Sequence, residues 1–148
     1  MAGPTLDIYA PSILNPKVKG EIEHYISTIS NYKEGNDFWL SGRPFFMIFE
    51  DPDEDEQDFL FDNWKPKSVI SVCAMCNSQS DHILLATLAD KIALITEGLV
   101  CLGDISNLPG AEHVLKLHGR YVIPEFGYFV TPSFICNYMS YDTFRLVK

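Results

Sequence analysis

The sequence predicts an α+β or α/β fold: a single domain (residues 1–148) with a mixed sheet of about five strands, two main helices and a short C-terminal helix. A chain of 148 residues has the usual length of one domain. Its 47% hydrophobic and 21% charged residues are typical of a globular protein. Strand-like and helix-like apolar patterns alternate along it, with no internal repeat or low-complexity linker.

The first third of the chain predicts a strand, a helix and a hairpin. Residues 6–9 form a short apolar run bounded by prolines, which is typical of an edge strand. Asn15 and Pro16 then provide an N-cap and a first-turn proline. Aromatic-rich runs at 38–40 and 45–49, separated by "SGRP", predict two hairpin strands. The helix after Asn15 carries an apolar stripe, at Val18, Ile22, Tyr25, Ile26 and Ile29.

The middle of the chain predicts a βαβ unit. Residues 67–75, "KSVISVCAM", are apolar on both faces, as in a central strand covered on both sides. A well-buried helix follows, with Ser80 as the best N-cap and Gly98 placed to end it. Residues 99–102 form the next strand, and such a unit is expected to be right-handed. The helical stripe contains Ile83, Leu84, Leu88, Ile92 and Ile95.

The last third predicts less regular structure. Residues 114–117 and 119–123 suggest a further strand or hairpin. Residues 133–141 suggest a short helix, with Thr131 as N-cap and Pro132 at its first position.

An acidic segment, residues 50–58, is the most unusual feature of the sequence. It holds seven carboxylates and no cation, and it supplies most of the net charge of −9, leaving the rest of the chain nearly balanced. Nucleic-acid binding is disfavoured, because no basic footprint is visible. The carboxylates belong to Glu50, Asp51, Asp53, Glu54, Asp55, Glu56 and Asp58.

This acidic segment has three interpretations: a solvated connection, a cation loop, or a surface for a basic partner. Asp51, Asp53 and Asp55 alternate as in a calcium loop. The sixth loop position, however, is Glu56 where glycine is needed, and the twelfth is Asp62. No metal is therefore predicted, although a weak divalent cation site stays open as an alternative.

Aromatic residues border the acidic segment and favour the partner surface as the sharper hypothesis. Carboxylates steer a basic protein, and aromatic rings provide anchors. The candidate partner-binding residues are the seven carboxylates together with Phe59 and Trp64. The simpler interpretation is a solvated chain reversal between sheet segments.

Cys73 and Cys76 form a C-x-x-C pair after a strand, which suggests a thiol redox protein or enzyme as the alternative function. The pair precedes the expected N-cap, so no helix dipole is placed to activate its first thiol. Cys101 and Cys136 lack the spacing of a zinc site, and no catalytic motif or cofactor-binding loop is present. We therefore expect reduced cysteines, no cofactor and no enzymatic activity.

The chain is expected to be cytoplasmic and not membrane-bound. Residues 1–7 lack the basic and apolar regions of a secretory signal. The longest apolar candidate, residues 83–100, is interrupted by charges.

Four fragments in order carry a family resemblance: "MAGPTLDIY", "DFWLSGRPFF", "DHILLATLADKIALITEGLVCLGD" and "YDTFRLVK". Together they resemble a family of small uncharacterised bacterial proteins that is similar to the immunity proteins of polymorphic toxin systems. The resemblance implies a cytoplasmic protein that neutralises a cognate toxin by covering its active site. A basic toxin is the hypothesis that the acidic segment adds, and we expect the protein to be a monomer or homodimer. The acidic segment is outside the shared pattern, so its role does not follow from the resemblance.

Overall fold

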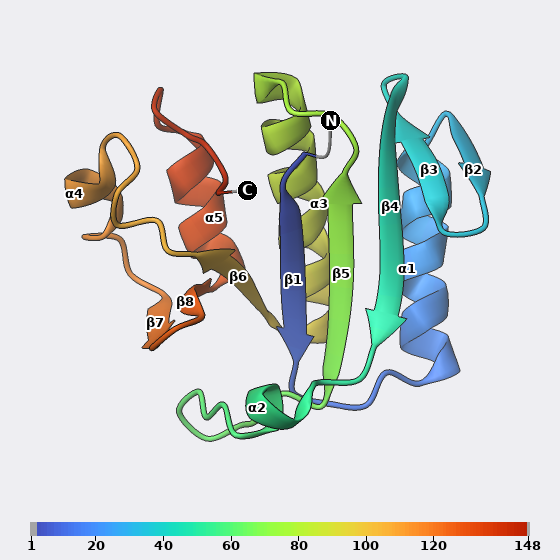
Figure 1. Ribbon diagram of the computed structural model, residues 1–148. Helices are drawn as coiled ribbons and strands as arrows, with labels where there is room; N and C mark the ends of the chain where they lie inside the picture. The colour runs from blue at the N-terminus through green and yellow to red at the C-terminus, as the bar shows by residue number, and fades with distance from the viewer. Residues whose placement is uncertain (1–2, 148) are drawn as a thin grey trace.

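The computed structural model describes residues 3–147, so the first two residues of the "MAGP" start and the final lysine of "FRLVK" lie outside the described part. Eight strands form one sheet in the order β2-β3-β4-β5-β1-β6-β8-β7, and every neighbouring pair is antiparallel (Figure 1). The strands are β1 (Thr5–Ala10), β2 (Tyr32–Glu34), β3 (Asp37–Leu40), β4 (Arg43–Glu50), β5 (Ser68–Ala74), β6 (Leu99–Gly103), β7 (Arg120–Ile123) and β8 (Gly127–Val130).

Three longer helices pack on one face of this sheet (Figure 1). Two short helices lie in the connections. None of the helices in residues 3–147 combines the length and apolar character needed to span a bilayer. The longer helices are α1 (Pro16–Ile29), α3 (Gln79–Thr96) and α5 (Pro132–Met139), and the short ones are α2 (Glu54–Gln57) and α4 (Ala111–Val114).

The helices begin where their capping residues place them. The Asn15 side chain accepts a hydrogen bond from the Val18 N–H, and Thr131 caps α5 in the same way, so both predicted N-caps are confirmed. The prediction of Ser80 as the cap of α3 is wrong. Ser78 caps that helix through a capping box with Asp81, because an acidic side chain three residues later can bond back to the cap.

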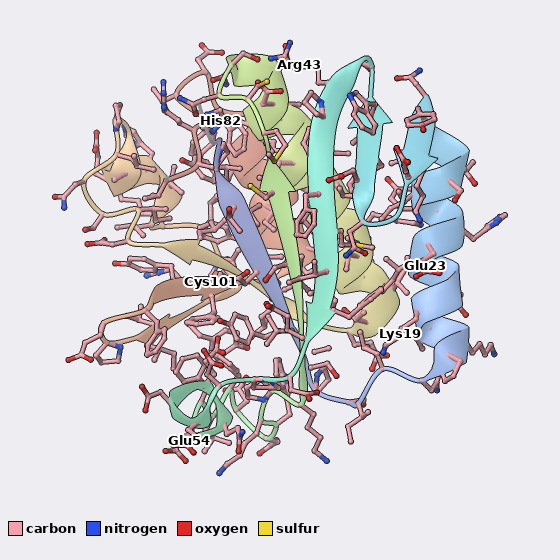
Figure 2. The ribbon with its side chains drawn as sticks, turned by 45° about the vertical axis from the view of Figure 1, so that its right-hand side comes forward. Lys19, Glu23, Arg43, Glu54, His82 and Cys101 are labelled. Carbon is pink, nitrogen blue, oxygen red and sulfur yellow. The ribbon has the colours of Figure 1, made fainter. Side chains whose placement is uncertain are left out.

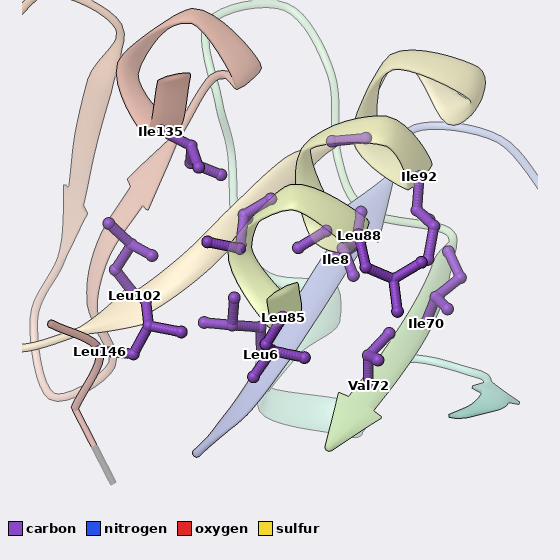
Figure 3. Packing of buried hydrophobic residues seen from close by; sticks show 14 of the residues in the cluster. Leu6, Ile8, Ile70, Val72, Leu85, Leu88, Ile92, Leu102, Ile135 and Leu146 are labelled. Atoms are coloured by element: carbon purple, nitrogen blue, oxygen red, sulfur yellow. The ribbon is translucent and has the colours of Figure 1, made fainter. Parts of the chain in front are cut away.

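The core lies between the sheet and the helices (Figure 3). Every second side chain of the central strands points toward the helices, as the two-residue period of a strand requires. Leu6, Ile8, Ile70 and Val72 pack against Leu85, Leu88 and Ile92 of α3, all with 2% exposure or less. Burial of these apolar side chains contributes to the hydrophobic stabilisation of the fold.

The first strand occupies a different place from the one predicted. β1 lies between β5 and β6, in the middle of the sheet, and not at an edge. Its prolines do not prevent this, because Pro4 and Pro11 lie outside the paired residues 5–10. β5 and β6 run in the same direction as the βαβ prediction requires, but β1 separates them.

The sheet is larger than predicted and contains no neighbouring parallel pair among the described strands. The prediction of about five strands in a mixed sheet is therefore wrong, whereas one α+β domain with two main helices and a short C-terminal helix agrees with the structure. Residues 119–123 contain a strand, β7, as predicted. The predicted strand at 114–117 is wrong, because these residues lie at the end of the short helix α4 and in the turns after it. The strands that the prediction lacks, β2 and β8, have only three and four residues. Such short strands carry too little periodicity to be recognised from sequence.

Candidate functional site: an acidic cavity on the second face of the sheet

The second face of the sheet carries no long helix, and the segment from residue 51 to residue 67 covers one end of it (Figures 1 and 2). The acidic run forms the short helix α2 at the start of this segment. Asp53 and Glu56 form a capping box, in which the Asp53 N–H donates to Glu56 Oε1 at 2.8 Å. The acidic residues are therefore partly ordered by one another, and not only a solvated loop.

Aromatic rings hold the segment against the sheet. Phe59 and Phe61 are buried and pack on Phe129 of β8, at ring-centroid distances of 5.3 and 4.8 Å. Trp64 packs on Phe61 at 5.1 Å and stays partly exposed. Phe59, a predicted partner anchor, thus points into the protein and contributes no exposed surface, whereas Trp64 keeps an accessible edge.

A hydrogen bond between Tyr9 and Glu56 also fastens the segment. The Tyr9 hydroxyl, on the middle strand β1, donates to Glu56 Oε2. Burial and this bond to a carboxylate both raise the pKa of Tyr9. One carboxylate oxygen of Glu56 therefore accepts the Asp53 N–H of the capping box, and the other accepts the Tyr9 hydroxyl of the sheet.

A cavity of about 180 Å³ opens between the segment and the sheet. Five of its seven lining residues are acidic, and none is cationic. The lining consists of Asp7, Glu50, Asp51, Asp53, Glu56, Val69 and Ser71. The fold thus gathers carboxylates from β1, from the end of β4 and from the acidic run around one hollow.

Ser71 lies between two of these carboxylates. Its hydroxyl oxygen is 2.6 Å from Asp7 Oδ1 and 3.0 Å from Glu50 Oε2. A hydroxyl has one proton, so it cannot donate fully to both acceptors. Burial raises the pKa of Asp7, and the charges of Glu56 and Glu50 raise it further, while the Ser71 bond opposes them. The surroundings of Asp7 therefore disfavour its ionised form.

The predicted acidic residues divide into two groups. Glu50, Asp51, Asp53 and Glu56 line the cavity. The remaining three predicted carboxylates are exposed and are not part of its lining. These are Glu54, Asp55 and Asp58.

Asp7 was missed by sequence reasoning. The available signal was its place between Leu6 and Ile8, because alternation turns it to the face opposite those core residues.

Three lysines lie near the cavity and limit its negative potential. Lys19 lines a neighbouring hollow that shares Glu50 and Asp51, and its ammonium lies 5.4 Å from the centre of the Phe49 ring. Lys65 and Lys67 line another hollow that shares Asp51. The acidic surface is therefore strongest at the cavity itself and is bordered by cations along residues 65–67.

The described residues contain no group of three or more His, Cys, Asp or Glu side chains that could hold a metal ion. The carboxylates thus surround the cavity without converging on one point. Cys73 is half-buried in β5 and Cys76 lies in the turn before Ser78, and both are free thiols. Burial raises the pKa of Cys101 to about 11, which makes this thiol unreactive at neutral pH.

Comparison with known proteins finds one family model and no individual protein. No curated protein and no solved structure matches the chain. A family model described as a family of unknown function, DUF6368, matches residues 2–148. The match covers the acidic segment, the sheet and the C-terminal segment alike. The chain therefore belongs to the DUF6368 family.

Proposed function

We propose that this protein is a binding protein whose acidic cavity docks a basic protein partner, and that the partner is a cognate toxin which it neutralises in the cytoplasm. One observation carries the proposal: five carboxylates line a single cavity that has no cationic side chain in its lining. The choice of a toxin as partner is supported by the sequence resemblance to immunity proteins.

The physical argument is that no cationic side chain in the lining of the cavity compensates this charge. Asp7, Glu50 and Glu56 repel one another, and burial adds to the cost of ionising Asp7. A cation from a partner would reduce both costs. An arginine side chain fits the arrangement well, since its planar group offers five donors and forms bidentate bonds with carboxylates.

The exposed carboxylates have a different role in the same proposal. Glu54, Asp55 and Asp58 lie outside the cavity in or next to α2. Charges at this position attract a basic partner over a distance and speed association, but they contribute less than buried contacts to the lifetime of the complex. The proposal therefore assigns affinity to the cavity and association rate to the exposed group.

The test uses two variants with the same change in charge. Asp7→Asn/Glu50→Gln removes two charges inside the cavity, and Glu54→Gln/Asp55→Asn removes two outside it. Glu56 and Asp53 are left intact, because they form the capping box. Binding to the purified product of any toxin gene that lies beside the gene of this protein is measured by calorimetry and stopped-flow at several salt concentrations.

The cavity variant should weaken binding by tenfold or more, mainly through faster dissociation. The exposed variant should slow association with a smaller loss of affinity. Lysozyme, an unrelated basic protein, controls for non-specific attraction. Equal affinity for both variants and the native protein would exclude the cavity as the docking site, and failure to protect cells that express the toxin would exclude the immunity role.

A further inference from the structure

The C-terminal segment Thr143–Val147 contains no helix or strand, yet it is firmly packed. Phe144 and Leu146 are each 3% exposed and belong to the main core. The Phe144 ring lies 4.8 Å from that of Tyr138 on α5, and Leu146 lies beside Leu102 of β6 (Figure 3). The segment thus covers apolar side chains of other elements that would be exposed without it.

Three polar side chains hold the backbone of this segment. Gln79 Nε2 donates to the Phe144 carbonyl at 2.9 Å, and the Tyr138 hydroxyl donates to the Arg145 carbonyl at 2.6 Å. The third is His82, whose Nδ1 accepts the Leu146 N–H at 3.0 Å. A segment without regular structure depends on such bonds, because its backbone groups have few other partners.

The bonds of His82 fix the protonation state of its ring. Its Nδ1 accepts from a backbone N–H, so this nitrogen carries no proton. Its Nε2 lies 2.9 Å from Asn77 Oδ1, which is an acceptor, so the proton is on Nε2. The ring is therefore neutral, in the Nε2–H tautomer, and it is 1% exposed.

We propose that His82 and the segment Thr143–Val147 form an acid-sensitive latch, in which protonation of the ring releases the segment from the core. A proton on Nδ1 would turn the acceptor of the Leu146 N–H into a second donor that faces it. It would also place a charge in a buried site. A histidine has an ordinary pKa of about 6.5, so such a change occurs in a range that cells use.

Two charged residues adjoin His82 and Leu146 in the sequence, Asp81 and Arg145. The carboxylate of Asp81, on the same helix, is already bonded to Arg43 of β4 and to Ser78. On the segment itself Arg145 is a cation, and α5 presents the neutral Tyr138. The proposal rests on the loss of the acceptor at Nδ1, and these charges do not restore it.

Sensitivity to pH comes from the difference between the packed and the released segment. In the released state the ring accepts a proton freely, whereas in the packed state it must stay neutral to accept from Leu146. Packing is therefore strongest above the ordinary histidine pKa and weakens as pH falls below it. The inference is independent of the acidic cavity, because none of these residues lines it.

The test is hydrogen exchange of the full chain, followed by NMR between about pH 7.5 and pH 5. The measured quantity is the protection factor of the Leu146 amide, compared with that of the Val72 amide in the central strand β5. We expect Leu146 protection to fall by up to about tenfold per pH unit, the limit for uptake of one proton. Protection of Val72 should stay constant, which separates local release from global unfolding.

Two variants test whether protonation of His82 causes the release of the segment. His82→Asn keeps an acceptor near the position of Nδ1 but cannot take up a proton, so the pH dependence at Leu146 should disappear. Asn77→Asp places a carboxylate against Nε2 and favours the charged ring, so release should move to higher pH. The exposed His24 serves as a control through His24→Asn, which should change nothing.

The same pH dependence in His82→Asn would overturn the proposal, and so would constant Leu146 protection down to the pH at which Val72 is also lost. If His82→Asn does not fold, the direction of the shift in Asn77→Asp decides alone. No shift, or a shift to lower pH, would overturn the latch.

Discussion

The guanidinium of Arg43, at the start of β4, holds both carboxylate oxygens of Asp81, in the first turn of α3. Arg43 Nη2 donates to Asp81 Oδ2 at 2.7 Å, and Nε donates to Oδ1. The N–H and hydroxyl of Ser78 donate to the same carboxylate at 2.7 and 2.8 Å. The bonds from Arg43 are the main reason that the pKa of Asp81 lies well below its ordinary value, against the effect of burial. The contact fixes the start of α3 to the sheet.

Substitution Asp81→Asn should destabilise the protein by about 2 kcal/mol, in the range of a hydrogen bond to a charged group. The folded-state pKa of Asp81 is lowered, so its contribution is complete above the ordinary aspartate pKa of about 3.9 and is lost as pH falls through the folded value. Urea unfolding should therefore show a difference between Asp81→Asn and native protein that shrinks as the solution becomes more acidic. The exposed Asp142→Asn is the matched control, and a similar loss there would contradict a specific role for Asp81.

Substitution Asp7→Asn should have the opposite effect. The folded-state pKa of Asp7 is raised, so its ionisation opposes folding as pH rises above about 3.9, the ordinary value. Asparagine still accepts the Ser71 hydroxyl bond but carries no charge toward Glu50 and Glu56. We expect a gain in stability at pH 7 that disappears at pH 3, where the carboxyl group is protonated in both states. Unfolding curves at both pH values check this, and a loss of stability at pH 7 would contradict it.

The aromatic contact of the acidic segment predicts that alanine substitutions at two neighbouring residues, Phe61 and Leu60, differ greatly in their effect on stability. Phe61 is 1% exposed and packs on Phe129, whereas Leu60 is 58% exposed. Phe61→Ala should cost about 3–5 kcal/mol, as for other buried phenylalanines. Leu60→Ala should change stability by less than about 0.5 kcal/mol. Thermal unfolding of the two variants measures the contrast, and a small effect of Phe61→Ala would show that the segment is not anchored by its ring.

Alanine substitutions at two glycines should change the stability of the protein in opposite directions. A Cβ at Gly98 would lie 2.6 Å from the Tyr9 carbonyl oxygen, so Gly98→Ala should destabilise by about 1–3 kcal/mol through overpacking. Gly20, inside α1, has open space within 4 Å of the position that an added methyl group would take, so Gly20→Ala should stabilise by about 1 kcal/mol through helix propensity. Circular dichroism melting curves of both variants test the pair. A neutral Gly98→Ala would mean that β1 can shift away from the end of α3.

Local signals in the sequence were sufficient for several elements. Asn15 with Pro16, and Thr131 with Pro132, start helices where their side chains predict, because capping depends on residues only a few positions apart. Gly98 was expected to end α3, but Glu97 adopts the left-handed conformation in its place. Gly98 is needed instead for close approach to β1, a contact between distant parts of the chain that no local pattern records.

The cavity could be predicted only in part, because its residues come from distant parts of the chain. The acidic run was evident, but Asp7 and Ser71 join it through strand register, which pairs these two residues directly across β1 and β5. The face on which each carboxylate lies was also unpredictable, because it depends on where Phe59 and Phe61 bury their rings. Sequence reasoning therefore identified the charge and missed the enclosure that the sheet provides.

The central place of β1 has a consequence for how the protein is made. β1 leaves the ribosome before its two neighbours, β5 and β6, and its register pairs Asp7 with Cys101. The first neighbour, β5, is complete only at residue 74 and the second, β6, only at residue 103, so until then the nascent chain keeps one or both edges of an apolar strand unpaired. Such long-range pairing slows folding and exposes the early strand to aggregation. In a growing chain, the polar Asp7 within this strand is a charge that discourages premature association.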